Sequence, residues 1–88
     1  MKGLTKIPKI NQVISSYFNA SPSVTKIRAK ELMPYFIDAE IFNKNPKDGL
    51  YIREILRELD RRNKLHLIPY VFPERKKTNT YWYFVKMN

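Results

Sequence analysis

The stretch IREILRELDRRNKLHLI (residues 52–68) decides the fold of this chain. Its first aliphatic residues recur at steps of three and four, which places them on one face of a helix, while the arginines gather on the opposite side. These aliphatic residues are Ile52, Ile55, Leu56 and Leu59. The pattern predicts an amphipathic helix over residues 49–62, followed at once by an apolar strand.

Both ends of this helix have residues suited to the position. Asp48 is a natural N-cap, because its carboxylate can accept hydrogen bonds from the first free backbone N–H groups. Asn63 stands where helices often end in a left-handed residue, a conformation that asparagine tolerates. The polar stretch 43–49 before the helix, rich in Asn and Lys with a Pro and a Gly, is the clearest loop in the chain.

Two weaker helical patterns precede that loop. The first predicts a helix over residues 8–19, with Pro8 in its first turn. The β-branched segment 24–27 is typical of a short strand or of a helix entry, and a second helix is predicted over residues 27–36. Pro34 should bend this helix or end it near Met33, and Asp38 could cap a further turn over residues 39–42.

The C-terminal quarter predicts an antiparallel hairpin. Two β-rich runs, Leu65–Phe72 and Thr80–Met87, flank a polar loop over residues 73–79. Pro69 indicates that its strand is an edge or carries a bulge. Alternation puts Tyr81, Tyr83, Val85 and Met87 on one face and Trp82, Phe84 and Lys86 on the other. One face must cover the helices, and the other is then exposed or covered by a partner.

In this order and size, the elements resemble the winged helix-turn-helix superfamily, and the resemblance covers nearly the whole chain of 88 residues. Its most specific part is the opening stretch, a helix with paired aliphatics, a charged end, a turn residue and an immediate apolar run. The resemblance implies an α+β fold: a single domain over residues 1–88, with three helices and a C-terminal β-hairpin wing. No short chemical signature accompanies this architectural match.

The resemblance also implies double-stranded DNA as the partner, with the third helix in the major groove and the wing on the backbone. The implied reading surface of that helix is Arg53, Glu54, Arg57, Arg61 and Lys64. The implied wing tip is Arg75, Lys76, Lys77, Thr78 and Asn79. Lys26, Arg28 and Lys30 are expected to hold phosphates at the start of the second helix. A transcriptional regulator or a mobile-element accessory factor would carry such a surface.

Other interpretations stay open. Glu58–Arg62 and Asp60–Lys64 have ideal i,i+4 spacing, so the charged face of the third helix could simply pair with itself. The connection 37–48 is much longer than the usual turn and locally acidic, which suits a protein contact. A protein-interaction module using this insertion and the aromatic strand is therefore an alternative, and the exposed tyrosines also suit a homodimer. A second alternative is RNA or single-strand binding through the aromatic strand.

Composition narrows the function classes. The formal net charge of +9 favours polyanionic partners. There is no cysteine, the only histidine is His66, and the only glycines are Gly3 and Gly49, so thiolate chemistry and a glycine-rich phosphate loop are excluded. We expect no enzyme, no catalytic residue, no metal and no cofactor. Short apolar runs predict no membrane span, and a cytoplasmic protein is expected, nucleoid-associated in a prokaryote.

Overall fold

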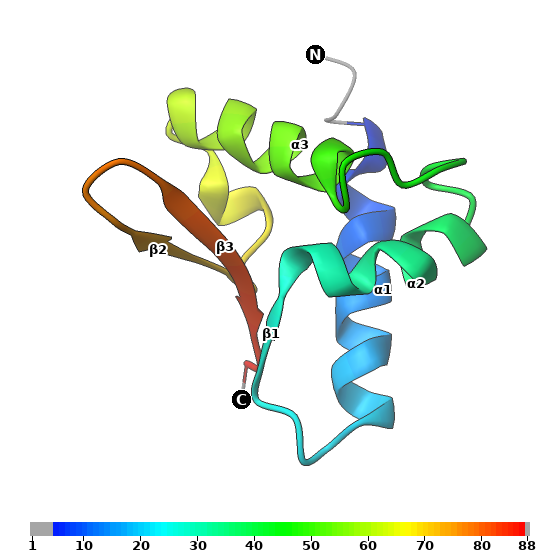
Figure 1. Ribbon diagram of the computed structural model, residues 1–88. Coiled ribbons are helices and arrows are strands. Elements are labelled where there is room, and N and C mark those ends of the chain that lie inside the picture. Colours follow the sequence, from blue (N-terminus) through cyan, green and yellow to red (C-terminus); the bar gives the residue numbers. More distant parts are fainter. Residues whose placement is uncertain (1–4, 88) are drawn as a thin grey trace.

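The computed structural model describes residues 5–87, in which helices precede a C-terminal hairpin (Figure 1). The helices are α1 (Ile7–Ala20), α2 (Met33–Asp38) and α3 (Leu50–Arg61), with 3-10 helices η2 (Ala29–Leu32) and η3 (Leu65–Leu67). The strands are β1 (Lys26–Arg28), β2 (Val71–Arg75) and β3 (Thr80–Val85). The predicted α+β class with three helices and a C-terminal hairpin is therefore confirmed.

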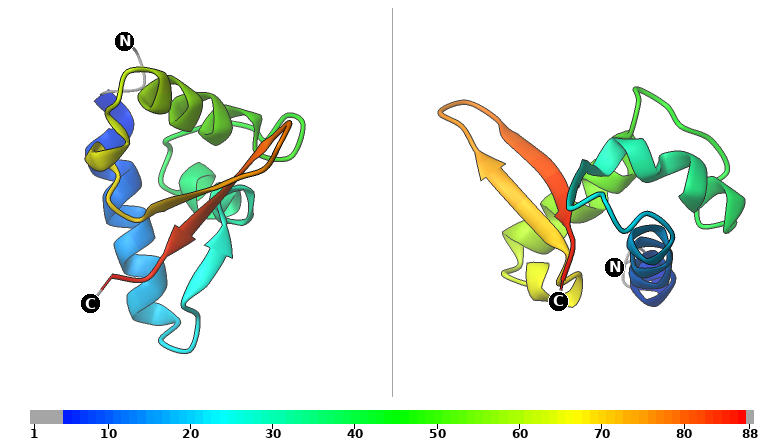
Figure 2. Two further views of the ribbon diagram at one scale, coloured as in Figure 1. Left: turned by 90° about the vertical axis from the view of Figure 1, so that its left-hand side faces the viewer. Right: turned by 90° about the horizontal axis from the view of Figure 1, so that it is seen from below.

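The three strands form one antiparallel sheet in the order β1-β3-β2. β3 pairs with β1 from Lys26 opposite Val85 to Arg28 opposite Tyr83. On its other side it pairs with all five residues of β2. The element order and this strand order together make a winged-helix-like topology. The hairpin extends away from the helices, and its tip projects beyond them (Figure 2).

One apolar cluster joins the helices to the inner face of the sheet. α1 contributes Ile10, Ile14 and Phe18, α3 contributes Ile52, Leu56 and Leu59, and β3 contributes Trp82 and Phe84. Phe36 of α2 lies at its centre, with edge-to-face contacts to Phe42 and Phe84. No charged side chain is buried among residues 5–87, so the basic character of the chain resides on its surface.

The region of the second helix differs from the prediction. Residues 26–28 form a strand and residues 29–32 a 3-10 helix, so the α-helix begins only at Met33. Pro34 lies in the first turn of α2, where its missing N–H has no intrahelical acceptor to lose, and it opens this helix instead of ending it. The predicted turn over residues 39–42 is also wrong. Glu40 is left-handed and Ile41 N donates to Phe36 O, which closes the helix.

The prediction for the third helix is confirmed to within one residue at each end. At its start, however, Gly49 and not Asp48 is the N-cap residue, and no side chain caps the helix. At its end, Asn63 has φ of 57° and Lys64 N donates to Leu59 O at 2.7 Å. This is the left-handed helix end that Asn63 predicts.

The first strand of the hairpin is shorter and lies later than predicted. Residues 65–67 form η3 and residues 69–70 a turn, so β2 begins at Val71. Pro73 and Arg75, predicted in the loop, belong to β2, and the loop shrinks to residues 76–79. β2 is an edge strand, which allows Pro73 because its position needs no ladder N–H. None of the described helices is long and apolar enough to cross a membrane.

Candidate nucleic-acid interface

A groove opens between α3, the junction of β1 with η2, and the hairpin. Its volume is about 670 Å³. Five cationic side chains line it, and one carboxylate, Glu74, stands among them. The cations are Arg28, Lys30, Arg53, Arg57 and Lys76, and the other lining residues include Asn79 and the β3 segment 80–83. We call this feature the basic groove.

The hairpin side of the basic groove is formed by the part of β3 that lies beyond the end of β1. Lys76 N donates to Asn79 O at 2.7 Å, on the side of β3 that faces β2. Because backbone groups alternate along an antiparallel ladder, those of Thr80 and Trp82 point the other way, towards β1. β1 ends at Arg28, before it reaches them. The groove therefore combines cationic side chains, which suit phosphate oxygens, with the part of β3 that β1 leaves uncovered.

On the α3 side, Arg53 is tied to the loop that precedes the helix. Its guanidinium donates to Asp48 O at 2.6 Å and to Lys47 O at 3.0 Å. Lys30 reaches the same loop, with its Nζ 3.1 Å from the Asp48 carboxylate. These contacts hold the connection between α2 and α3 against η2, and they occupy part of the hydrogen-bonding capacity of two groove cations.

This close approach depends on Gly49. The residue is buried and has φ of 99°, a left-handed conformation that side chains disfavour. A Cβ at this position would lie 2.6 Å from Lys30 Cβ and 3.1 Å from Lys30 Cα. Glycine thus lets the backbone that starts α3 pack directly on the η2 segment, which sets the width of the groove at that end.

Arg57 is a groove arginine whose guanidinium is free within residues 5–87, as is that of Arg28. Arg57 is exposed, it lines the groove one turn after Arg53, and the structure gives it no ion pair or hydrogen-bond partner within residues 5–87. Its fork can therefore meet a phosphate or a guanine edge without breaking an internal contact.

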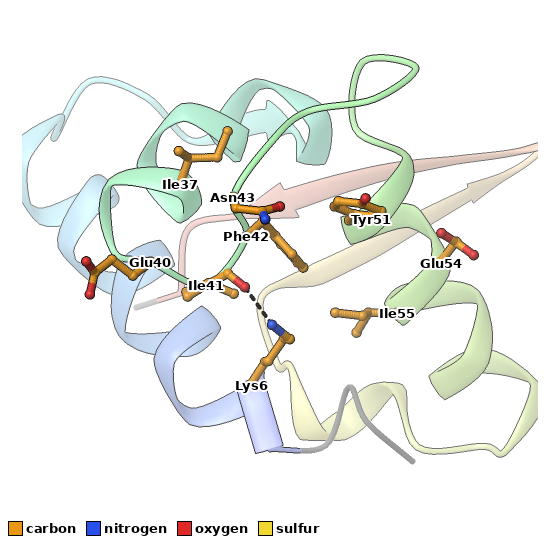
Figure 3. A pocket seen from close by; sticks show the side chains of 9 residues that line it. All are labelled: Lys6, Ile37, Glu40, Ile41, Phe42, Asn43, Tyr51, Glu54 and Ile55. Carbon is orange, nitrogen blue, oxygen red and sulfur yellow. Dashed lines mark hydrogen bonds between the residues drawn. The ribbon is translucent and has the colours of Figure 1, made fainter.

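The opposite flank of α3 carries Glu54 and Glu58 and lies apart from the groove. Glu58 pairs with Arg61 and with Arg62, the latter at 2.5 Å, so the predicted i,i+4 pair 58–62 is present. Glu54 lines a different hollow of about 920 Å³, built mainly from the connection after α2 (Figure 3). Phe42 and Tyr51 flank that hollow, and Lys6 Nζ donates to Ile41 O at 2.6 Å across its base.

The hairpin is fastened to α3 by a two-fold ion pair. The Arg75 guanidinium donates to both carboxylate oxygens of Asp60, at 2.9 and 3.0 Å. These hydrogen bonds lower the pKa of Asp60 and raise the pKa of Arg75, each stabilising the charge of the other. The predicted pair Asp60–Lys64 is replaced by this contact. Arg75 is thus an anchor of the wing, whereas Lys77 and Thr78 stand at its exposed tip.

The structure therefore separates the predicted site residues into two sets. Those that line the basic groove are Arg28, Lys30, Arg53, Arg57, Lys76 and Asn79. Those that lie elsewhere are Lys26, Glu54, Arg61, Lys64, Arg75, Lys77 and Thr78. The sequence prediction missed the contribution of residues 80–83 of β3 to the groove, although Thr80 follows the predicted loop directly. That contribution depends on the end of β1 at Arg28, and three residues of strand leave a weak pattern.

Other kinds of site find little support in the described part of the chain. No group of three or more His, Asp or Glu side chains there could hold a metal ion. His66 lies in η3, not in a strand as predicted, and its side chain is exposed. Comparison with protein-family models, curated proteins and solved structures gives no match, so the role of the groove has to be inferred from its own chemistry.

Proposed function

We propose that this protein binds double-stranded DNA through the basic groove, with α3 and the hairpin on either side of the contacted backbone. The observation that carries the proposal is the convergence of five cations, from β1, η2, α3 and the hairpin loop, around a groove with a single carboxylate. Residues far apart in the sequence supply these charges. Ion pairing within α3 alone, the alternative interpretation of its charged face, therefore does not account for the groove. The sugar–phosphate backbone of a nucleic acid is the common partner of such a surface.

The two flanks of α3 support an oriented contact. Arg53 and Arg57 face the groove, while Glu54 and Glu58 face away from it. A duplex that approached the opposite flank would meet the carboxylate of Glu54, which repels phosphates, and two arginines already paired with Glu58. The proposed contact therefore uses the edge of α3 nearest the hairpin, with Arg28 and Lys76 on the backbone and Arg57 nearest the bases.

Salt dependence tests the proposal. Fluorescence anisotropy with a labelled duplex of mixed sequence should give binding at ~50 mM salt that weakens steeply as salt rises, because neutralised phosphates release counterions. With about three to five contacts, log K against log[salt] should fall with a slope of roughly −3 to −5.

Charge-matched variants locate the contact. Arg28→Gln with Arg57→Gln removes two groove cations and should make the slope shallower by about 2. Lys9→Gln with Arg62→Gln removes the same charge outside the groove and should leave the slope nearly unchanged. Equal effects of the two double variants would show that net charge alone attracts DNA. Absence of duplex binding at low salt would refute the proposal.

A second candidate is protein binding at the hollow shown in Figure 3. It is favoured by the open apolar lining that Ile37, Phe42 and Tyr51 supply from the long connection and the start of α3. Ile37→Ser, at a partly exposed residue of this lining, should then abolish partner capture and leave duplex affinity intact, whereas Arg57→Gln should do the reverse. Copurification followed by anisotropy on both variants separates the two functions.

A further inference from the structure

The outward face of the sheet carries rings and cations side by side. The register sets Arg28 opposite Tyr83 and Phe72 opposite Tyr83 on the other flank, so the three side chains share one face. Their neighbours two residues along belong to the same face. The outer sheet face is therefore Lys26, Arg28, Phe72, Glu74, Tyr81, Tyr83 and Val85.

Two rings of this face are open to solvent. Phe72 is 43% exposed and Tyr81 is 49% exposed, whereas Trp82 and Phe84 on the inner face are 6% and 0% exposed. The core thus accounts for the inward rings of β3, whereas Phe72 and Tyr81 on the outward face stay about half exposed. Exposed aromatic rings on a sheet are a surface on which nucleic-acid bases can stack.

The charge on this face fits a nucleic-acid strand. Lys26 Nζ lies 5.0 Å from the centre of the Phe72 ring and 4.3 Å from that of Tyr83. The cation–π contacts hold a positive charge over these two rings. A base that stacks on Phe72 from this side must displace the Lys26 ammonium, which can then pair with the phosphate of that nucleotide. Lys26 and Arg28 stand against one carboxylate, Glu74, whose oxygen is itself 3.9 Å from Lys76 Nζ.

The outer sheet face is continuous with the basic groove. Arg28, Tyr81 and Tyr83 belong to the face and also line the groove. A strand that left a duplex held in the groove could therefore pass over β3 and meet Tyr81 first, then Phe72. Trp82 takes no part in this path, because its side chain is buried.

We propose that the outer sheet face binds unpaired nucleotides, so that the favoured substrate is a duplex bordered by a single-stranded segment. This inference rests on the proposed duplex binding and adds the substrate class. Stacking on Phe72 and Tyr81 is independent of base identity, because every base has a flat face. The preference is therefore for the structure of the nucleic acid and not for the sequence of its single strand.

The test compares duplexes with and without an overhang. Anisotropy is measured with a blunt labelled duplex and with the same duplex extended by about six unpaired nucleotides at the 3′ or the 5′ end. The protein should bind one overhang at least ~10-fold more tightly than the blunt duplex, as expected for stacking of a base on an exposed ring.

Variants assign the gain to the rings. Phe72→Ala with Tyr81→Ala should remove the preference for the overhang. Phe72→Ala alone, whose ring lies outside the basic groove, should weaken that preference and keep the affinity for the blunt duplex. Tyr35→Ala is the matched control, since Tyr35 is 48% exposed but lies on α2. Circular dichroism verifies that each variant is folded. The fluorescence of 2-aminopurine placed in the overhang should change on binding the native protein and not on binding the double variant.

The outcomes are distinguishable. Equal affinity for blunt and extended duplexes would overturn this inference and leave duplex binding in place. No affinity for any duplex would overturn the proposed function itself. A dimer in sedimentation that Phe72→Ala with Tyr81→Ala dissociates would show that a second copy covers the face, which also overturns the inference.

Discussion

At the scale of single residues, the three arginines on the exposed side of α3 have different roles. Arg53 donates to two loop carbonyls, and Arg61 pairs with Glu58. Arg57 lies between them and has no such partner among residues 5–87. Since a side chain already engaged must give up a contact before it binds a ligand, Arg57 is the one best prepared for recognition.

Arg57→Ala should therefore cost more duplex affinity than Arg61→Ala, although both remove one charge from the same helix. We expect a loss of about 1–3 kcal/mol for the first, near the cost of a lost bidentate contact, and a smaller loss for the second. Anisotropy at fixed salt measures both. Equal losses would mean that the basic groove is not the surface that α3 presents to DNA.

The sequence predicts which residues lie on the exposed side of α3, but not which flank the hairpin approaches. Arg53 and Glu54 are neighbours in the chain and stand about 100° apart around the helix. The periodicity therefore predicts that both side chains belong to the reading surface. In the structure, Arg53 lines the basic groove, whereas Glu54 lines the hollow beside the connection between α2 and α3. The deciding contacts are long-range, and periodicity within one helix contains no information about them.

At the scale of elements, long periodic segments were predictable and short ones were not. α1 and α3 each carry a continuous apolar stripe, and their predicted bounds differ from the structure by one residue. The run 65–70 is rich in strand-forming residues but folds as η3 and a turn, with Ile68 buried in the core and Leu67 O accepting from Asn11 Nδ2. Contact with α1 decides that segment, and propensity does not reveal it.

The hairpin depends on the pair of Asp60 and Arg75 for its position beside α3. The Arg75 guanidinium lowers the pKa of Asp60 through its hydrogen bonds, so folding favours the ionised carboxylate. This contribution is fully present above the ordinary value of about 3.8 and is lost as the pH falls through the lowered value. Arg75 stays charged throughout, because the same contact raises its pKa.

Asp60→Asn should therefore lower the melting temperature near neutral pH and have less effect as the pH drops below about 3.8. Thermal unfolding followed by circular dichroism over pH 7 to about 2 measures the difference between variant and native protein. Asp38→Asn is the control, since Asp38 is exposed and has no ion pair in the described part of the chain. A difference that persists unchanged in acid would exclude an electrostatic origin.

At the scale of the whole molecule, α3 and the hairpin can act as one surface only if a single core fixes both. Phe36 makes this connection, because it contacts Phe42 of the long connection and Phe84 of β3 and is fully buried. Leu56 and Leu59 of α3 belong to the same cluster. The geometry of the basic groove therefore depends on core packing. A substitution that loosens the core should move the groove cations apart even though none of them is mutated.

Phe36→Ala tests this dependence. Truncation of a buried phenylalanine costs about 3–5 kcal/mol, against a total stability of roughly 4–13 kcal/mol for a chain of this size. We therefore expect a large fall in the denaturant midpoint, with duplex affinity lost in proportion to the unfolded fraction. Tyr35→Ala, one residue away and exposed, should cost much less despite its contact with Tyr17. Phe36→Ala could destabilise the protein strongly while the remaining folded fraction binds duplex with native affinity and native salt slope. The groove would then not depend on the contacts of Phe36 in the core. The contacts of α3 alone would then have to carry the recognition.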